Sequence, residues 1–282
     1  MERTVNLADA LADALADALA DGVRRGLFGG ATAAFSGPDG RVHRAAAGTV
    51  TPGDPAPVTP GTRADLGPLT RLCTAVVAHE LAQVGAIDLD RPTGRGFTPR
   101  QLLTHTSGLP AGSDAWRRDD LRPAQKLQRV LDSPLLSAPG EVVRDSDVGY
   151  VVLGDLLEDA TGQGLDSLVE EFVTLPLGLD GPRFGPVPGP VLGTGVVGDE
   201  LARSLRRPAG HAGLFGTAEE VHALGRALPA GTLEAGDGWR TGGAALVLDP
   251  AAGTCLALLT DRPAADLAAF GKSLARGPAG PT

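Results

Sequence analysis

Hydrophobic and polar residues alternate along the chain in patterns that predict hairpins near both ends and helices between them. Leucines four residues apart (Leu7, Leu11, Leu15 and Leu19) predict an amphipathic helix at the start of the chain. Two short strands are predicted around the Pro-Asp-Gly turn at 38–40, and two more around the Asp-Pro-Ala-Ala-Gly turn at 249–253. Helical spacing of apolar residues predicts further helices from about Pro68 onward, within 98–110, and over 121–133, 145–162, 164–179, 217–228 and 263–277.

This order of elements predicts an α+β fold. A hairpin at each end and helices in the middle indicate an antiparallel sheet built from both termini and flanked by helices. We expect residues 1–66 together with 236–282 to form this sheet lobe, and residues 67–235 to form a mostly helical lobe. The two lobes would make one interleaved unit with a cleft between them.

The composition and net charge of the chain limit the kinds of partner that we expect it to bind. The chain has 282 residues and a net charge of −9, with no basic cluster interleaved with aromatic residues, so we expect no nucleic-acid partner. Its start lacks the pattern of a secretory signal, and no apolar run reaches the roughly 18 residues that span a bilayer, so we expect no membrane partner and a cytoplasmic location. The many glycines, prolines, alanines and arginines are typical of a bacterial protein from a GC-rich genome. Cys73 and Cys255 belong to no disulfide framework or metal-binding pair.

Four stretches of the chain stand out: "LLTHTSGLP" at 102–110, which is the most specific, and the blocks at 139–179, 198–224 and 245–262. They resemble the serine β-lactamase and penicillin-binding-protein superfamily, and most closely its branch of class C β-lactamases and related esterases. The resemblance covers nearly the whole chain and implies a β-lactamase-like fold.

That family acylates a serine, and the resemblance implies where its catalytic groups would stand here. In the family a serine begins a helix, and a lysine one turn later lies on the same face. The matching stretch "ADLGPLTRLCTA" has Pro68 at the serine position and Arg71 at the lysine position. Asp145-Ser146-Asp147 stands for the Tyr-x-Asn motif, and "GWRTGG" at 238–243 is all that represents the strand-borne Lys-Thr-Gly or His-Thr-Gly.

These departures argue against acyl-enzyme chemistry. Proline carries no nucleophile, and arginine stays protonated and cannot act as a base. Neither of the two lysines, Lys126 and Lys272, has a serine three residues before it, and no Gly-x-Ser-x-Gly elbow occurs. We therefore treat Pro68 as a lost catalytic position.

Three charged residues are the catalytic candidates. Arg71 would hold an anion at the floor of the cleft; its alternative is an ion pair with Asp65, Asp145 or Asp147. Asp145 and Asp147 would act as a general acid/base pair; their alternative is to cap the following helix.

The ligand-binding candidates are Trp116, Trp239, Arg240 and His105. Either tryptophan would wall a ligand pocket or only pack, and His105, like His211, stands in a loop that shapes the site in the family. Cys73 falls on the far side of its helix from Arg71, so we expect it to be buried and inert. No spacing of ligands indicates a metal site, and we expect no cofactor.

Three functions remain open at this point. The first is a repurposed enzyme of specialised metabolism, which would use non-covalent acid/base chemistry on a small molecule bound in the cleft, for example cyclisation, isomerisation or elimination. The second is an inactive pseudoenzyme with a binding, scaffold or regulatory role. The third, a residual esterase, needs a nucleophile that the sequence does not offer. The oligomeric state and the substrate do not follow from the sequence.

Overall fold

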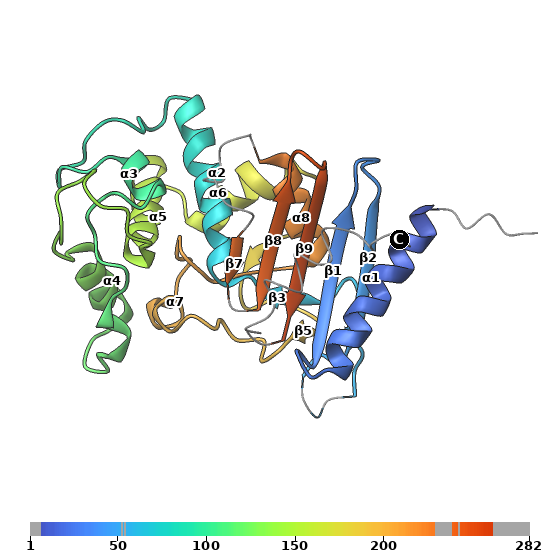
Figure 1. Ribbon diagram of the computed structural model, residues 1–282. Helices are drawn as coiled ribbons and strands as arrows, with labels where there is room; N and C mark the ends of the chain where they lie inside the picture. The colour runs from blue at the N-terminus through green and yellow to red at the C-terminus, as the bar shows by residue number, and fades with distance from the viewer. Residues whose placement is uncertain (1–6, 52, 54, 229–238, 242, 262–282) are drawn as a thin grey trace, which may run out of the picture. The chain divides into compact units, whose positions relative to one another are not determined.

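The two predicted hairpins, from opposite ends of the chain, pair into one antiparallel sheet. In the computed structural model the strand order is β2-β1-β9-β8-β7, and β1 of the first hairpin lies against β9 of the second (Figure 1). Ala33, for example, is paired with Ala45 on one side and with Leu258 on the other. The predicted α+β fold with a sheet built from both termini is confirmed. The strands are β1 (Gly30–Ser36), β2 (Val42–Gly48), β7 (Trp239–Thr241), β8 (Ala244–Asp249) and β9 (Thr254–Thr260).

The structure describes residues 7–51, 53, 55–228, 239–241 and 243–261, and the chain divides into two compact units. Unit 1 contains Met1–Leu66, Gly185–Val196 and Phe215–Thr282, and unit 2 contains Gly67–Phe184 and Val197–Leu214. The sequence-based division into a sheet lobe of 1–66 with 236–282 and a helical lobe of 67–235 stays a prediction. The predicted cleft between the lobes stays a prediction, and the predicted helix at 263–277 lies outside the described residues.

The N-terminal helix α1 (Leu7–Arg24) buries its apolar side against the sheet. Leu15 and Leu19 are buried together with Phe28, as the leucine spacing predicts. The strands β1 and β2 each contain three alanines, whose small side chains let a helix approach a sheet closely. Burial of this apolar area is what fixes α1 on the β1–β2 hairpin.

A second helix, α8 (Ala218–Ala227), also packs against the sheet. It begins with a capping box, in which Thr217 accepts from the Glu220 amide and the Glu220 side chain accepts from the Thr217 amide. From this helix the buried His222 forms a 2.8 Å hydrogen bond with the hydroxyl of Ser36 on β1. Burial, together with the charge of Arg226, lowers the pKa of His222 to about 4.

Unit 1 also contains a small group of short strands. The strand β3 pairs in parallel with β5 and antiparallel with β6, where Ala64 faces Gly216. The short strands of the chain are β3 (Arg63–Asp65), β4 (Arg183–Phe184), β5 (Val191–Leu192) and β6 (Leu214–Gly216).

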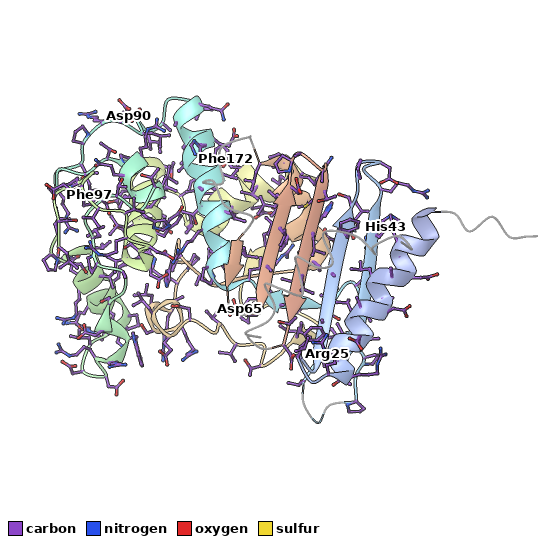
Figure 2. The ribbon with its side chains drawn as sticks, viewed as in Figure 1. Arg25, His43, Asp65, Asp90, Phe97 and Phe172 are labelled. Carbon is purple, nitrogen blue, oxygen red and sulfur yellow. The ribbon has the colours of Figure 1, made fainter. Side chains whose placement is uncertain are left out.

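Unit 2 is built around the helix α2 (Thr70–Gln83), most of whose residues are buried. Apolar side chains of α5 and α6 pack against it, and α3 packs on α5. In the loop before α3, Phe97 is buried and the guanidinium of Arg95 lies 5.4 Å from its ring centre (Figure 2). The remaining helices of this unit are α3 (Pro99–Leu103), α4 (Pro123–Leu131), α5 (Asp147–Thr161), α6 (Leu165–Val169) and α7 (Glu200–Leu205), with 3₁₀ turns at Gly67–Leu69 and Asp114–Arg117 and a π turn at Glu170–Thr174.

The buried histidine of α8 makes unit 1 sensitive to acid. Unfolded, His222 takes up a proton near its ordinary pKa of 6.5, whereas in the folded protein it resists protonation down to about pH 4. Between these values the unfolded state binds more protons, so its free energy falls relative to the folded state as the pH drops. We expect His222→Gln, which cannot titrate but can still bond Ser36, to lose less stability than the wild type between pH 6.5 and 4. Urea midpoints over this range measure it, and two parallel curves would contradict it.

Candidate functional site

The chain enters the site through a tight turn that ends in α2. Gly67 has a φ of +49°, a conformation that glycine adopts at little cost, and a 3₁₀ turn over Gly67–Leu69 follows. Pro68 therefore stands two residues before the α-helix, and Arg71 is in its first turn. The buried leucines Leu69 and Leu72 fix this end of the helix in the core. Pro68 contributes no polar side-chain atom at the position that the family resemblance assigns to the nucleophile.

The side chain of Arg71 is buried and paired with two carboxylates. It is only 7% exposed, and its Nη1 donates to Asp145 Oδ1 at 2.5 Å while its Nη2 donates to Asp147 Oδ1. Burial on its own would lower the pKa of the guanidinium, but the charges of Asp147 and Asp145 and their hydrogen bonds outweigh it and raise that pKa above its usual value. Arg71 is thus a permanent cation whose two terminal nitrogens face the protein's own carboxylates.

Both aspartates reach the same guanidinium because of the backbone between them. Ser146 is extended, with φ −133° and ψ 109°, and in extended chain residues i and i+2 point to the same side. Asp145 and Asp147 therefore face Arg71, while the Ser146 hydroxyl points away, donates to Pro110 O at 2.6 Å and accepts from Gly149 N at 2.8 Å. The cap of α5 is Ser146, so neither aspartate is used as the helix cap.

The loop "LLTHTSGLP" holds this segment in place. The carbonyl of His105 accepts from Arg144 N at 2.8 Å, and its Nδ1 accepts from Ser146 N at 3.1 Å. Farther along the loop, Ala111 O accepts from Asp147 N at 2.8 Å. His105 has a φ of +58°, which is uncommon for a residue other than glycine, and this conformation accompanies both of its bonds to the segment. His105 and Ala111 thus hold the Asp145–Asp147 segment through hydrogen bonds from its main-chain amides.

An aromatic ring completes the surroundings of the guanidinium. Tyr150 is buried on α5, its ring centre lies 5.4 Å from Arg71 Cζ and 5.2 Å from the ring of His105, and its hydroxyl donates to Leu103 O. A guanidinium near an aromatic ring is stabilised by the electrons of the ring. Tyr150 was not among the predicted site residues. It lies one turn after Asp147, so both residues are on one side of α5.

The structure thus brings together four of the predicted site residues: Arg71, Asp145, Asp147 and His105. The ion pairs of Arg71 with Asp145 and Asp147 match one of the two alternatives drawn from the sequence. Their predicted roles in catalysis and ligand binding stay predictions. Cys73 is buried as expected, and its burial raises the pKa of its thiol to about 12.

Trp116 lies apart from this cluster, and the positions of the Trp239 and Arg240 side chains are not described. Trp116 lies half-buried in the 3₁₀ turn before α4, where Arg117 Cζ is 4.7 Å from its ring centre and Lys126 Nζ donates to its carbonyl at 3.2 Å. Trp239 and Arg240 are on β7 in unit 1, and their side chains lie outside the described part of the chain. Ligand binding by these three residues stays a prediction.

A separate hollow, with a cavity volume of about 10 Å³, lies beside α5 in unit 2. Its polar wall is an ion-pair group in which Arg207 contacts Glu158 and lies 3.8 Å from Asp155. This volume is below the range of about 300–1,000 Å³ that is typical of small-molecule pockets. The hollow therefore does not compete with the Arg71 cluster as a ligand site.

Neither a metal-binding group of side chains nor a membrane-spanning helix is present in the described residues. Within them, no group of three or more histidine, cysteine, aspartate or glutamate side chains is arranged to hold a metal ion. Among the helices of this part of the chain, none is long and apolar enough to cross a membrane.

Comparisons with known proteins place the chain among relatives of known fold. A family model described as Beta-lactamase matches residues 12–253. Penicillin-binding protein 4 of Amycolatopsis lactamdurans is 30% identical over 168 residues, which cover 54% of this chain and 43% of that protein. A putative D-alanyl-D-alanine carboxypeptidase of Escherichia coli is 31% identical over 157 residues, which cover 44% of this chain and 36% of that protein. The match therefore spans less than half the length of these curated relatives.

A solved structure described as a class C beta-lactamase superposes on this chain with a TM-score of 0.77. The superposition covers 100% of both chains at 14% sequence identity. At this identity the likeness shows the fold alone, and it agrees with the fold that the sequence predicts.

The two aspartates should be energetically coupled through Arg71. Asp145→Asn or Asp147→Asn leaves one carboxylate to balance the guanidinium, so each change should cost little in stability. The double variant buries a cation without a counter-charge, and we expect it to lower the free energy of unfolding by about 3 kcal/mol, more than the two single changes together. Urea unfolding of the four proteins at pH 7 measures this coupling.

A matched pair of aspartates serves as the control. Asp90 and Asp120 each pair with an exposed arginine, Arg100 and Arg118. Their substitutions by asparagine should be additive, because no buried charge links them. Additive costs at Asp145 and Asp147 as well would show that the protein does not depend on them to balance Arg71.

Proposed function

This chain belongs to the beta-lactamase family, and on that premise we propose that it is a small-molecule enzyme that works without a covalent acyl-enzyme. In this proposal Asp147 moves a proton on the bound molecule, as in a cyclisation, an isomerisation or an elimination. Asp145 and Arg71 complete the charged group around it.

One observation carries the proposal: Arg71 holds two carboxylates side by side while solvent still reaches them. The Asp147 side chain is 35% exposed and that of Asp145 is 79% exposed. A general base must lie within reach of its substrate, and a hydrogen bond to a cation orients its carboxylate. Asp147 is solvent-accessible, is oriented by Arg71, and is fixed at the first turn of α5.

Near this cluster, the described residues offer no serine hydroxyl that is placed to act as a nucleophile. By the family resemblance, Pro68 stands at the serine position and Arg71 at that of the lysine. The hydroxyl of Ser146 is used between Pro110 O and Gly149 N. A serine–histidine pair does exist in unit 1, Ser36 with His222, but both side chains are buried and no substrate would reach them. These positions argue against a residual esterase.

A second candidate, a binding protein without catalysis, is favoured by a different feature of the same cluster. Both terminal nitrogens of Arg71 already bond Asp145 and Asp147. An arginine satisfied in this way has a structural role in the absence of any ligand, and the cluster would persist in a protein that has no reaction to perform. The two candidates differ in whether a bound molecule is consumed.

The named relatives support a small-molecule ligand in either case, because one of them is called a D-alanyl-D-alanine carboxypeptidase. Binding of the ligand in a cleft between the two lobes is part of the proposal. A bacterial origin, a role in specialised metabolism and a cytoplasmic location stay predictions.

The absence of an acyl-enzyme can be tested by mass spectrometry. We expect no adduct and no turnover after incubation with a chromogenic cephalosporin, a fluorescent penicillin and a p-nitrophenyl ester, because Pro68 stands where the family resemblance places the nucleophilic serine. A family member with an intact Ser-x-x-Lys motif is the positive control. A stable adduct on any serine of this chain would refute the non-covalent mechanism.

Proton transfer by Asp147 can be tested with a defined mixture of D-amino-acid amides, D-alanyl dipeptides, 3-oxo acids and N-acyl amino acids. We expect the wild type to convert at least one component, and Asp147→Asn to lose at least about 100-fold in rate, the usual contribution of a general acid/base. The control Asp90→Asn removes an exposed, arginine-paired carboxylate elsewhere in unit 2 and should keep full activity.

The outcome separates the two candidates. A component that binds without being converted would favour the binding protein. A rate that Asp147→Asn leaves unchanged would remove Asp147 from the mechanism, provided that the melting temperature of the variant equals that of the wild type.

A further inference from the structure

We propose that Arg71 and His105 form a binding seat for a carboxylate, and that Asp145 occupies this seat until a ligand carboxylate displaces it. This carboxylate seat consists of Arg71 Nη1 and His105 Nε2. The inference rests on the proposed function, since it names the ligand class of the same site: a small molecule bearing a carboxylate.

Two nitrogen atoms border the seat. Arg71 Nη1 lies 2.5 Å from Asp145 Oδ1, and His105 Nε2 lies 3.7 Å from the same oxygen. Because His105 Nδ1 accepts the Ser146 amide, a neutral ring carries its hydrogen on Nε2, on the side of Asp145. Both side chains are largely buried, with exposed fractions of 7% for Arg71 and 16% for His105. The donors are therefore positioned before any ligand arrives, which lowers the entropy cost of binding.

Asp145, which occupies the carboxylate seat in this structure, is the most solvent-exposed residue of the cluster. Asp145 is 79% exposed, against 35% for Asp147. An exposed carboxylate regains its hydration when it leaves an ion pair, so the net stabilisation from such a pair is small. Asp147 stays on Nη2 and continues to balance the buried charge. Asp145 is thus the partner that a ligand can replace.

Displacement requires only the rotation of one side chain. The main chain on both sides of Asp145 is fixed, since Arg144 N and Ser146 N each donate to His105. The carboxylate of Asp145 swings about two side-chain bonds into solvent, while the start of α5 and Asp147 keep their places. The acid/base group therefore remains aligned during the exchange.

Charge selects the class of ligand. Replacing one carboxylate by another leaves the charge around Arg71 unchanged, whereas a neutral or cationic ligand would leave Nη1 without an anionic partner. Nη1 and Nη2 belong to one guanidinium, so a carboxylate on Nη1 sets the neighbouring carbon of the ligand beside Asp147. The proton that Asp147 moves would then be one close to the carboxylate of the ligand.

The test uses acetate as the probe. In the wild type, tethered Asp145 competes with free acetate, whereas Asp145→Ala leaves the seat open. We expect Asp145→Ala to bind acetate about fivefold more tightly than the wild type, because this factor corresponds to the upper end of what an exposed ion pair contributes. Isothermal titration with sodium acetate at constant ionic strength, against sodium chloride, measures the difference. In the variant, acetate should shift the side-chain NMR signals of Arg71 and His105.

The matched control is Asp90→Ala, which makes the same change in charge but uncovers the exposed Arg100 rather than a buried donor. It should not gain affinity. A gain equal to that of Asp145→Ala, no gain in either variant, or shifts confined to other arginines would each overturn the seat. None of these results bears on proton transfer by Asp147. Conversely, acetate binding to Asp145→Ala together with unchanged turnover in Asp147→Asn would keep the seat and reject the proposed reaction.

Discussion

A buried guanidinium must be balanced, and the arrangement of unit 2 around Arg71 follows from that constraint. An unpaired cation in this position would cost several kcal/mol, because water is removed from it and nothing replaces the lost hydration. The chain meets this cost with two carboxylates and one aromatic ring, supplied by the segment that begins α5. The start of α5 must therefore lie over the first turn of α2, and the loop that carries His105 holds it there through main-chain hydrogen bonds.

The same constraint separates the tasks of neighbouring residues. Within Asp145-Ser146-Asp147, the extended backbone sends the serine to cap the helix and both aspartates to the guanidinium. Because one carboxylate is enough to neutralise Arg71, the second is available for other work. In the proposed exchange, the difference in exposure between Asp145 and Asp147 decides which carboxylate moves and which stays. The same ion pairs of Arg71 would then serve both the stability of the fold and the exchange of a ligand, and neither role would weaken the other.

Much of the fold was predictable because its signals are local. The leucine spacing of α1, the turn residues of both hairpins and the caps of α5 and α8 each specify an element within a few residues of sequence. The way in which the segment 185–196 joins unit 1 has no local signal of this kind. The segment 185–196 joins unit 1 through the short pairing of β5 with β3, and two residue pairs leave no periodic pattern in a sequence. Non-local pairing of this kind is beyond an argument from spacing.

The candidate site was predictable only as far as the family motifs extend. The family resemblance identified Arg71, Asp145, Asp147 and His105 as candidate site residues. The structure brings these four together. The partner of each nitrogen of Arg71 was not predictable, since that depends on the χ angles of three side chains. The role of Tyr150 was missed because a single aromatic residue on a buried helix is usually part of a core. In a family whose serine chemistry needs a lysine that can lose its proton, an arginine at that place changes the requirement from a base to a fixed charge. In the proposed exchange this fixed charge stays paired at all times, because a ligand carboxylate takes the place of the exposed carboxylate of Asp145.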